Sequence, residues 1–179
     1  MSDARTIMTA KEMARTLERL ASEIIERRGE GGPLMLVGIQ RRGVDLARRL
    51  KKLLDARLAA PTLFGMLDIN LYRDDWSNLG IAPTISNTDI PAGIEGASLI
   101  LVDDVLYSGR TTRAALEAIL DFGRPRRVEL LVLIDRGHRE LPIQADYVGK
   151  RVNTASHERV DVLVAERDTQ DKVLLRAKA

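Results

Sequence analysis

The stretch Leu99–Thr112, LILVDDVLYSGRTT, is the most informative part of this chain. Its four leading aliphatic residues predict a strand buried on both faces, which is typical of a central strand in a parallel sheet. Asp103 and Asp104 follow at the point where we expect that strand to end. A short loop of small and polar residues comes next, and the good helix formers of Arg113–Leu120 follow it. This order predicts an α/β fold with a site for a phosphorylated sugar.

The residue types of this stretch suit phosphate and ribose. Loop amides and a helix N-terminus bind phosphate, and paired carboxylates bind ribose hydroxyls or Mg²⁺. An acidic pair after an apolar strand has three other interpretations: a Mg²⁺ site beside a P-loop, a phosphoacceptor domain, and a solvated strand end. The chain contains no G-x-x-x-x-G-K-[ST] motif, which argues against the P-loop.

The composition favours one cytoplasmic α/β domain over residues 1–179. Hydrophobic residues make up 45% of the chain and aromatic residues only 3%, which argues against an aromatic-rich β-sandwich. The absence of cysteine excludes a disulfide framework and a thiolate metal site. No apolar run reaches 18 residues, and the first residues lack a charged segment followed by an apolar core. We therefore expect neither a membrane partner nor a secretory signal.

Charge is unevenly distributed along the chain, although the net charge is only +2. Residues 1–60 carry 13 Lys and Arg against 8 Asp and Glu, whereas residues 61–110 carry 2 against 7. Ordinary solvated helix faces explain much of this asymmetry. A functional interpretation is a basic surface for nucleic acid, separate from an acidic site that uses a metal.

Hydrophobic periodicity and turn residues predict alternating strands and helices. The capping box Thr9–Glu12 predicts the start of a helix, and a glycine cluster with Pro33 ends it. The remaining predicted elements are strand Leu34–Ile39, helix Gly43–Leu58, strand Thr62–Tyr72, a long loop over Arg73–Ala92, strand 99–102, helix 111–122, and strands Arg127–Asp135, Tyr147–Gly149 and Val160–Val164. This order indicates a mainly parallel sheet with helices on both faces.

Two segments resemble a known family. Val102–Thr111 resembles the phosphoribosyl pyrophosphate (PRPP) motif of type I phosphoribosyltransferases, and Val132–Lys150 is similar to a segment of the PyrR family, the bifunctional pyrimidine-operon regulators and uracil phosphoribosyltransferases. The resemblance covers nearly the whole chain. It implies the type I phosphoribosyltransferase fold, with a PRPP loop over residues 99–112 and a flexible hood loop over about 73–92 that closes over the site and excludes water.

The resemblance assigns a pyrophosphate loop to Gly38–Gly43. Glycines at both ends of this segment allow backbone amides to approach an anion, and Gln40, Arg41 and Arg42 lie between them. The resemblance implies that Arg41 and Arg42 bind the diphosphate of PRPP. Without it, a basic turn before a helix explains the segment equally well.

The resemblance also implies roles for the acidic pair and the loop that follows it. Asp103 and Asp104 bind the ribose hydroxyls directly or through Mg²⁺, the expected cofactor, and with Arg41 they form the catalytic set. Backbone and side chains of the next seven residues hold the 5′-phosphate: Val105, Leu106, Tyr107, Ser108, Gly109, Arg110 and Thr111. Ser108 replaces the usual threonine of the family and keeps its hydroxyl.

The implied reaction joins uracil to PRPP and yields UMP and diphosphate. Arg136, with its neighbouring backbone, and Val160 are the expected contacts of the base. For Arg136 the assignment depends on the family match, and for Val160 core packing is the simpler explanation. A transferase for another base, such as hypoxanthine or orotate, and an RNA-binding regulator with only residual activity remain alternatives.

The family resemblance further implies regulation by RNA binding, with UMP or UTP and PRPP competing for one pocket. The expected partner is the leader RNA of pyrimidine genes, and a homodimer or homotetramer is expected. Arg15 and Arg19 are four residues apart, so they share a helical face opposite the apolar one. The complete predicted RNA-binding set is Arg15, Arg19, Arg27, Arg28, His138, Arg139, Lys150 and Arg151. Exposed arginines on an amphipathic helix also occur in proteins that bind no RNA.

Overall fold

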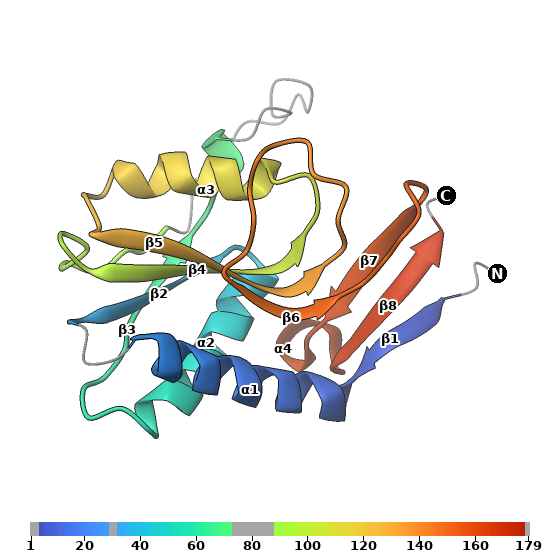
Figure 1. Cartoon of the computed structure of the whole chain (residues 1–179), viewed down its shortest axis with the longest axis horizontal. Helices are drawn as coiled ribbons and strands as arrows, with labels where there is room; N and C mark the ends of the chain where they lie inside the picture. Colours follow the sequence, from blue (N-terminus) through green and yellow to red (C-terminus); the bar gives the residue numbers. More distant parts are fainter. Residues whose placement is uncertain (1–3, 29–31, 73–87, 178–179) are drawn as a thin grey trace.

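The computed structural model describes residues 4–28, 32–72 and 88–177. Its central element is a five-stranded parallel sheet in the order β3-β2-β4-β5-β6 (Figure 1). The strands are β2 (Leu34–Ile39), β3 (Leu63–Leu67), β4 (Ser98–Leu106), β5 (Arg127–Asp135) and β6 (Tyr147–Arg151). All six residues of β2 are buried, as expected for a strand with neighbours on both sides and helices on both faces. The mainly parallel sheet is thus confirmed.

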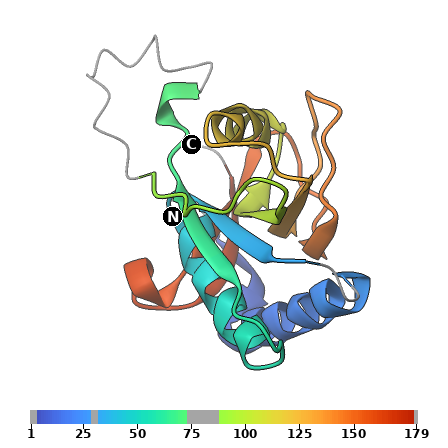
Figure 2. The ribbon, with the colours of Figure 1, turned by 90° about the vertical axis from the view of Figure 1, so that its left-hand side faces the viewer.

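Helices cover both faces of this sheet, as predicted (Figures 1 and 2). α1 (Ala10–Arg28) and α2 (Arg42–Asp55) lie on one face, and α3 (Arg110–Leu120) lies on the other. Two hydrophobic cores result. One joins α1, α2 and the sheet, and the second joins α3 to the opposite sheet face.

The predicted capping box is present at the start of α1. The Thr9 amide donates to Glu12 Oε2 at 2.7 Å, and the Glu12 amide donates to Thr9 Oγ1 at 3.3 Å. These reciprocal bonds satisfy amides that have no partner within the helix, and they hold the pKa of Glu12 below its usual value. A local sequence signature therefore correctly located this helix end.

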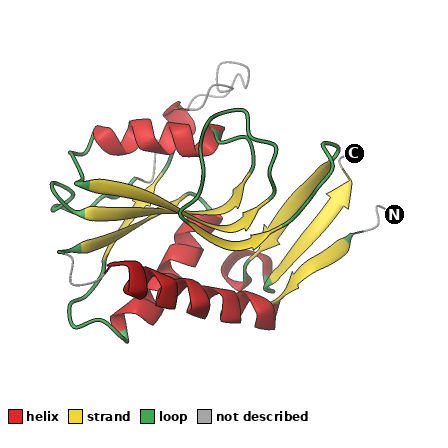
Figure 3. Cartoon of the chain, in the orientation of Figure 1, coloured by secondary structure: helices red, strands yellow, loops and turns green. Residues whose placement is uncertain are grey.

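A second, three-stranded antiparallel sheet was not predicted. Its order is β1-β8-β7, formed by β1 (Arg5–Thr9), β8 (Lys172–Ala177) and β7 (Glu158–Leu163) (Figure 3). The short helix α4 (Ala165–Asp168), also unpredicted, connects β7 to β8. β1 and β8 are short, and they join opposite ends of the chain. The predicted last strand therefore belongs to this sheet and not to the parallel one.

Several predicted boundaries also require correction. β4 continues to Leu106, because its ladder with β5 runs from Ser98–Arg127 to Leu106–Asp135. The acidic pair consequently lies within this strand and not after it. The predicted strand Thr62–Tyr72 contains the shorter β3 and a 3-10 turn over Asn70–Tyr72.

The predicted hood loop lies mostly outside the described residues, which resume at Thr88. Its last part contacts the edge strand β3. The Met66 amide donates to the Asp89 carbonyl and the Asp89 amide donates to the Met66 carbonyl, each at 2.8 Å. Within the described residues, no helix is both long and apolar enough to cross a membrane.

Candidate active site

The segments that follow β2, β4 and β5 meet at the carboxyl edge of the parallel sheet (Figure 1). Open α/β sheets bind their ligands at this edge. The same edge receives β7, which contacts β4. The structure therefore brings together the predicted pyrophosphate loop, the acidic pair, the predicted PRPP loop and the segment after β5.

Asp103 and Asp104 occupy the part of β4 next to this edge. Asp103 is buried, with only 8% of its surface exposed. Backbone amides bind both carboxylates: the Asp104 amide donates to Asp103 Oδ1 at 2.9 Å, and the Val105 amide donates to Asp104 Oδ1 at 2.8 Å. Neither carboxylate forms an ion pair with a residue in the described part of the chain.

The pKa values of both carboxylates are raised. Burial raises the pKa of Asp103 well above its usual value, and repulsion from Asp104 raises it further. Burial also raises the pKa of Asp104, while the Arg42 guanidinium opposes that rise. Two adjacent carboxylates that are poorly hydrated are costly to ionise together, so a bound cation or cationic sugar would be strongly favoured there.

These carboxylates fit Mg²⁺ as it is usually bound beside phosphate. No group of three or more His, Cys, Asp or Glu side chains among the described residues is arranged to hold a metal ion. Mg²⁺ rarely requires such a group, because it keeps several waters and takes one or two carboxylates together with substrate phosphates. The acidic pair supplies that number of ligands.

The loop after β4 forms the start of α3. Gly109 has φ = 94° and precedes the first helical residue, a conformation that L side chains rarely adopt. Ser108 lies beside it, with its hydroxyl accepting a hydrogen bond from the Arg110 amide at 3.3 Å. The N-terminus of an eleven-residue helix and a serine hydroxyl are thus placed together, which is an arrangement that binds phosphate.

The segment after β5 wraps around this loop. The Glu140 and Leu141 amides donate to the Ser108 carbonyl at 2.9 and 3.2 Å. Arg139 Nη1 donates to the Tyr107 carbonyl at 2.9 Å, while Arg139 Nη2 pairs with Asp135 at 2.7 Å. Arg139 therefore fixes the conformation of both loops.

Arg136 is buried in the same region, with 4% of its surface exposed. Its guanidinium lies 4.2 Å from the ring centroid of Tyr107 and donates to Thr154 Oγ1 at 3.1 Å and to the Ala155 carbonyl at 3.3 Å. The stacking on Tyr107 was not predicted, because nothing in the local sequence indicates this contact between two loops.

The glycines of the predicted pyrophosphate loop are needed for close packing. A Cβ on Gly38 would lie 2.4 Å from Val44 Cα, and one on Gly43 would lie 2.3 Å from the Val102 carbonyl oxygen. Both positions thus bring the start of α2 against the sheet beside the acidic pair. The Gln40–Arg41 peptide between them is cis.

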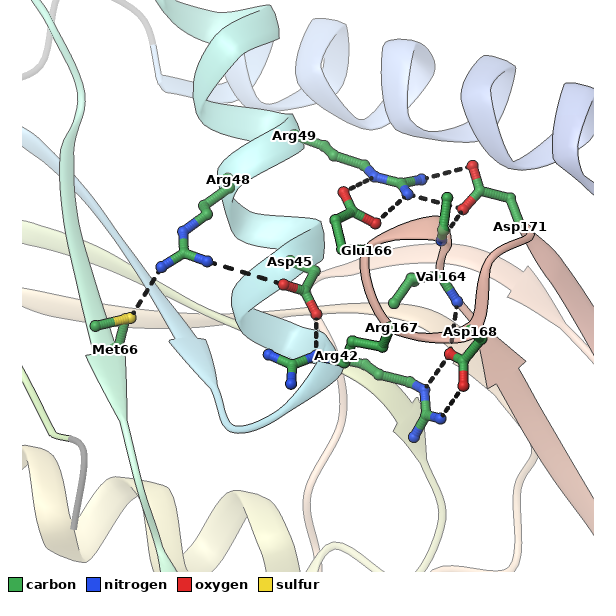
Figure 4. Close-up of polar contacts among 11 residues, drawn as sticks. Arg42, Asp45, Arg48, Arg49, Met66, Val164, Glu166, Arg167, Asp168 and Asp171 are labelled. Carbon is green, nitrogen blue, oxygen red and sulfur yellow. Dashed lines mark hydrogen bonds and ion pairs between the residues drawn. The ribbon is translucent and has the colours of Figure 1, made fainter.

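The two arginines of this loop differ in their surroundings. Arg41 is exposed, and its side chain makes no hydrogen bond or ion pair with a described residue. It borders a cleft of about 640 Å³ that Gln40, Arg48 and Arg167 also line. Arg42 instead forms a two-point contact with Asp168 on α4, through Nε at 3.2 Å and Nη2 at 2.9 Å (Figure 4). Sequence reasoning missed Asp168, which lies in no motif.

Comparison with known proteins agrees with this geometry. The pattern of the phosphoribosyl transferase domain family matches residues 3–166. The bifunctional protein PyrR of Elusimicrobium minutum is 49% identical over 174 residues, covering 97% of each chain. The same protein of Thermus aquaticus is 50% identical over 172 residues, covering 96% of this chain and 95% of its own.

The chain belongs to the PyrR family of phosphoribosyltransferases. A solved hypoxanthine-guanine phosphoribosyltransferase from Bacillus anthracis superposes with a TM-score of 0.71, covering 97% of this chain and 98% of its own. At 18% sequence identity this likeness concerns the fold alone. The type I phosphoribosyltransferase fold predicted from the sequence is thereby confirmed.

The predicted RNA-binding residues of this PyrR family member do not lie on one face. Arg19 Nη2 donates to the Gly149 carbonyl at 2.6 Å, Arg27 Nη1 to the Asp146 carbonyl at 2.8 Å, and Lys150 Nζ to the Ile7 carbonyl at 2.7 Å. Arg28 contacts the Gly32 carbonyl. Arg19, Arg27 and Lys150 thus attach α1 and β1 to the β6 region. Arg151 is the last residue of β6.

The remaining members of that set have other positions. Arg15 is exposed on α1, where no hydrogen bond or ion pair joins its side chain to a described residue. His138 Nε2 lies 2.6 Å from the Thr154 carbonyl oxygen, in the loop that also contains Arg139. Figure 1 places that loop on the α3 side of the sheet, opposite α1.

Val160 lies on β7 and is half-buried. It packs against the same hydrophobic core as Val105, which follows the acidic pair on β4. The antiparallel sheet thus brings Val160 toward the carboxyl edge although β7 is not part of the parallel sheet. The predicted contact of Val160 with the base stays a prediction.

Proposed function

We propose that this chain transfers the phosphoribosyl group of PRPP to uracil, forming UMP and diphosphate. The observation that carries the proposal is the acidic pair on β4 next to the start of α3 at Gly109, because carboxylates suit ribose or a metal and a helix N-terminus suits phosphate. Membership of the PyrR family supports the choice of uracil.

In the proposed reaction, the bond between ribose C1 and the diphosphate oxygen breaks as uracil N1 bonds to C1. The diphosphate leaves with the electron pair of the broken bond, and it takes up the proton that uracil N1 releases. Asp103 and Asp104 hold the ribose hydroxyls and stabilise the positive charge that develops on the sugar. Mg²⁺, when bound, would neutralise charge on the diphosphate.

The surrounding loops bind the rest of PRPP in this proposal. Ser108 and the backbone from Val105 to Thr111, at the start of α3, hold the 5′-phosphate, and Arg110 lies at the first helical position. Arg41 binds the diphosphate with its uncommitted guanidinium, beside Gln40. Arg136 stacks on Tyr107 and so holds this ring in place beside the base. Val160 supplies an apolar contact to the base.

The experiment that tests this activity incubates the protein with Mg²⁺, PRPP and one base at a time. Uracil, hypoxanthine, guanine and orotate are compared, and nucleotide formation is measured. We expect UMP to form at least about 100-fold faster than any other nucleotide, since a site built to hydrogen-bond one base rejects others strongly. A faster reaction with hypoxanthine or guanine would assign the chain to purine bases instead.

We also propose that the chain regulates pyrimidine genes by binding their leader RNA, with UMP or UTP in the active site favouring the RNA-bound state. The name bifunctional protein PyrR of its relatives supports a second activity. Filter binding of that RNA with and without UMP tests it. We expect tighter binding with UMP, and no binding at low salt would leave the enzyme activity alone. We further propose a homodimer or homotetramer, which sedimentation would test.

A further inference from the structure

A row of charges on α2 contacts the segment around α4. Arg42 pairs with Asp168, Asp45 pairs with Arg167, and Arg49 pairs with both Glu166 and Asp171 (Figure 4). We call these contacts the α2–α4 clasp. Arg42, Asp45 and Arg49 follow each other at spacings of three and four residues, so they share one face of α2.

The clasp has an end at the candidate site and an end away from it. Arg42 is the first residue of α2 and follows Arg41 directly. The next residue, Gly43, packs against the acidic pair, because a Cβ on Gly43 would lie 3.2 Å from Asp103 Cα. Arg49 lies two helical turns farther along α2.

Asp168 is itself immobilised by the backbone. Its Oδ2 accepts a hydrogen bond from the Val164 amide at 2.9 Å, and its own amide donates to the Val164 carbonyl at 2.7 Å. Its Oδ1 and Oδ2 then bind Arg42 at two points. A carboxylate fixed in this way determines the plane of the guanidinium, because the two parallel bonds permit one relative orientation.

Arg42 keeps donors for a second anion in this arrangement. A guanidinium has five N–H groups, and the bidentate contact with Asp168 uses two of them. The side chain of Arg42 is still 35% exposed. An arginine whose orientation is already fixed loses less conformational entropy when it binds a ligand than a free one.

We propose that Asp168 is a positioning residue that orients Arg42 toward the diphosphate of PRPP. This inference rests on the proposed function and names a contribution from α4 to the same site. Asp168 does not touch the substrate; it acts through Arg42. The antiparallel sheet thereby becomes part of the substrate site, because α4 connects its strands β7 and β8.

Asp171 supplies a matched control. It also binds an α2 arginine at two points, Arg49 Nη1 at 2.9 Å and Arg49 Nη2 at 2.7 Å. It also accepts a backbone hydrogen bond next to α4, from the Ala165 amide at 2.8 Å. Asp168 and Asp171 therefore have similar structural roles, and only Asp168 lies at the site end of the clasp.

The experiment compares Asp168→Asn with Asp171→Asn. Each variant loses one charged pair, so we expect both to lower Tm by similar amounts. Asp168→Asn should raise the KM for PRPP about 10-fold, as expected for one weakened charged hydrogen bond, and leave the KM for uracil within about 2-fold. Asp171→Asn should leave both KM values within about 2-fold of wild type. Asp168→Glu should recover part of the PRPP affinity.

Binding of inorganic diphosphate with Mg²⁺, measured by calorimetry, separates this inference from the proposed function. A wild-type protein that binds diphosphate but makes no UMP would overturn the uracil transferase, and the loss of diphosphate affinity in Asp168→Asn would still support the positioning role. Equal affinity in wild type and Asp168→Asn, or an equal loss in Asp171→Asn, would overturn it. If Asp168→Asn does not fold, Arg42→Lys replaces it, since lysine keeps the charge but cannot bind at two points; unchanged diphosphate affinity would then overturn the inference.

Discussion

Charged side chains are concentrated both at the carboxyl end of β4 and on the outer face of α1, but the two groups differ in their burial and in their partners. On β4, Asp103 is buried and the adjacent Asp104 is half-buried, and no ion pair joins either to a described residue. On α1, Arg19 and Arg27 are exposed, yet each contacts a backbone carbonyl near β6 and the same glutamate, Glu23. The acidic pair, and not the arginines of α1, is therefore the unusual group of charges.

This difference has an energetic basis. An uncompensated buried carboxylate destabilises a fold, and such groups are concentrated at functional sites. An exposed arginine that binds carbonyls and a carboxylate contributes to structure at little cost. The state of a charge in the fold, more than its presence in the sequence, therefore identifies a candidate for function.

The largest expected effect is on the acidic pair. Asp104→Asn should reduce kcat by about 100- to 1,000-fold, because one preorganised group facing a developing charge contributes that much. Steady-state kinetics with uracil and PRPP measures the change, and circular dichroism checks the fold. Near-normal kcat in a folded variant would show that this end of β4 does not serve catalysis.

The Arg41 side chain has no hydrogen-bond or ion-pair partner in the described part of the chain. Arg41→Ala should weaken PRPP and diphosphate binding by about 10- to 100-fold, the effect of removing one or two hydrogen bonds to a charged group. UMP lacks a diphosphate, so its affinity should change by less than about 2-fold. Calorimetric titration of both ligands measures this, and equal losses would indicate that Arg41 is structural.

The pH dependence of stability should reveal the buried charge. Asp103 has a pKa above its usual value of 3.8 in the folded state, so folding favours its protonated form. In wild type, this carboxyl group therefore costs no stability below pH 3.8. The free energy of unfolding falls as the pH rises from there toward the raised pKa. Asp103→Asn lacks this loss, and its advantage should grow with pH by about 1.4 kcal/mol for each unit of pKa shift.

Urea unfolding of both proteins from pH 3 to pH 8, about the range in which carboxylates titrate, measures that difference. The carboxylates with lowered pKa values, such as Asp171, are present in both proteins, so their contribution cancels. A constant difference in unfolding free energy across this range would contradict a raised pKa at Asp103.

The smallest expected effect is on the α1 face. Arg15→Ala should reduce affinity for leader RNA by about 3- to 10-fold and decrease the salt slope by about 1, without lowering Tm, since one phosphate contact is lost. Arg19→Ala removes contacts to the Val148 and Gly149 carbonyls and should lower Tm as well. Filter binding at several salt concentrations measures both variants. Unchanged binding by Arg15→Ala would exclude that residue from the RNA surface.

Local patterns in the sequence determined much of the parallel half of the molecule. The bounds of β2 and β5 match the prediction, because continuous aliphatic runs between turn residues are characteristic of buried parallel strands. The capping box located the start of α1. The acidic pair and the polar loop after it indicated the site, since a short contiguous segment carries both phosphate- and ribose-binding groups.

Only the tertiary structure determined which distant residues meet. β1 and β8 come from opposite ends of the chain, and Arg42 pairs with a carboxylate 126 residues away. Arg136 stacks on Tyr107 between two loops, and the arginines of α1 contact carbonyls near β6. Such contacts arise when the sheet assembles and brings remote segments together, whereas periodicity and motifs report only on neighbours along the chain. The sequence therefore indicated which chemistry the chain carries, and the fold determined which charges are left available to perform it.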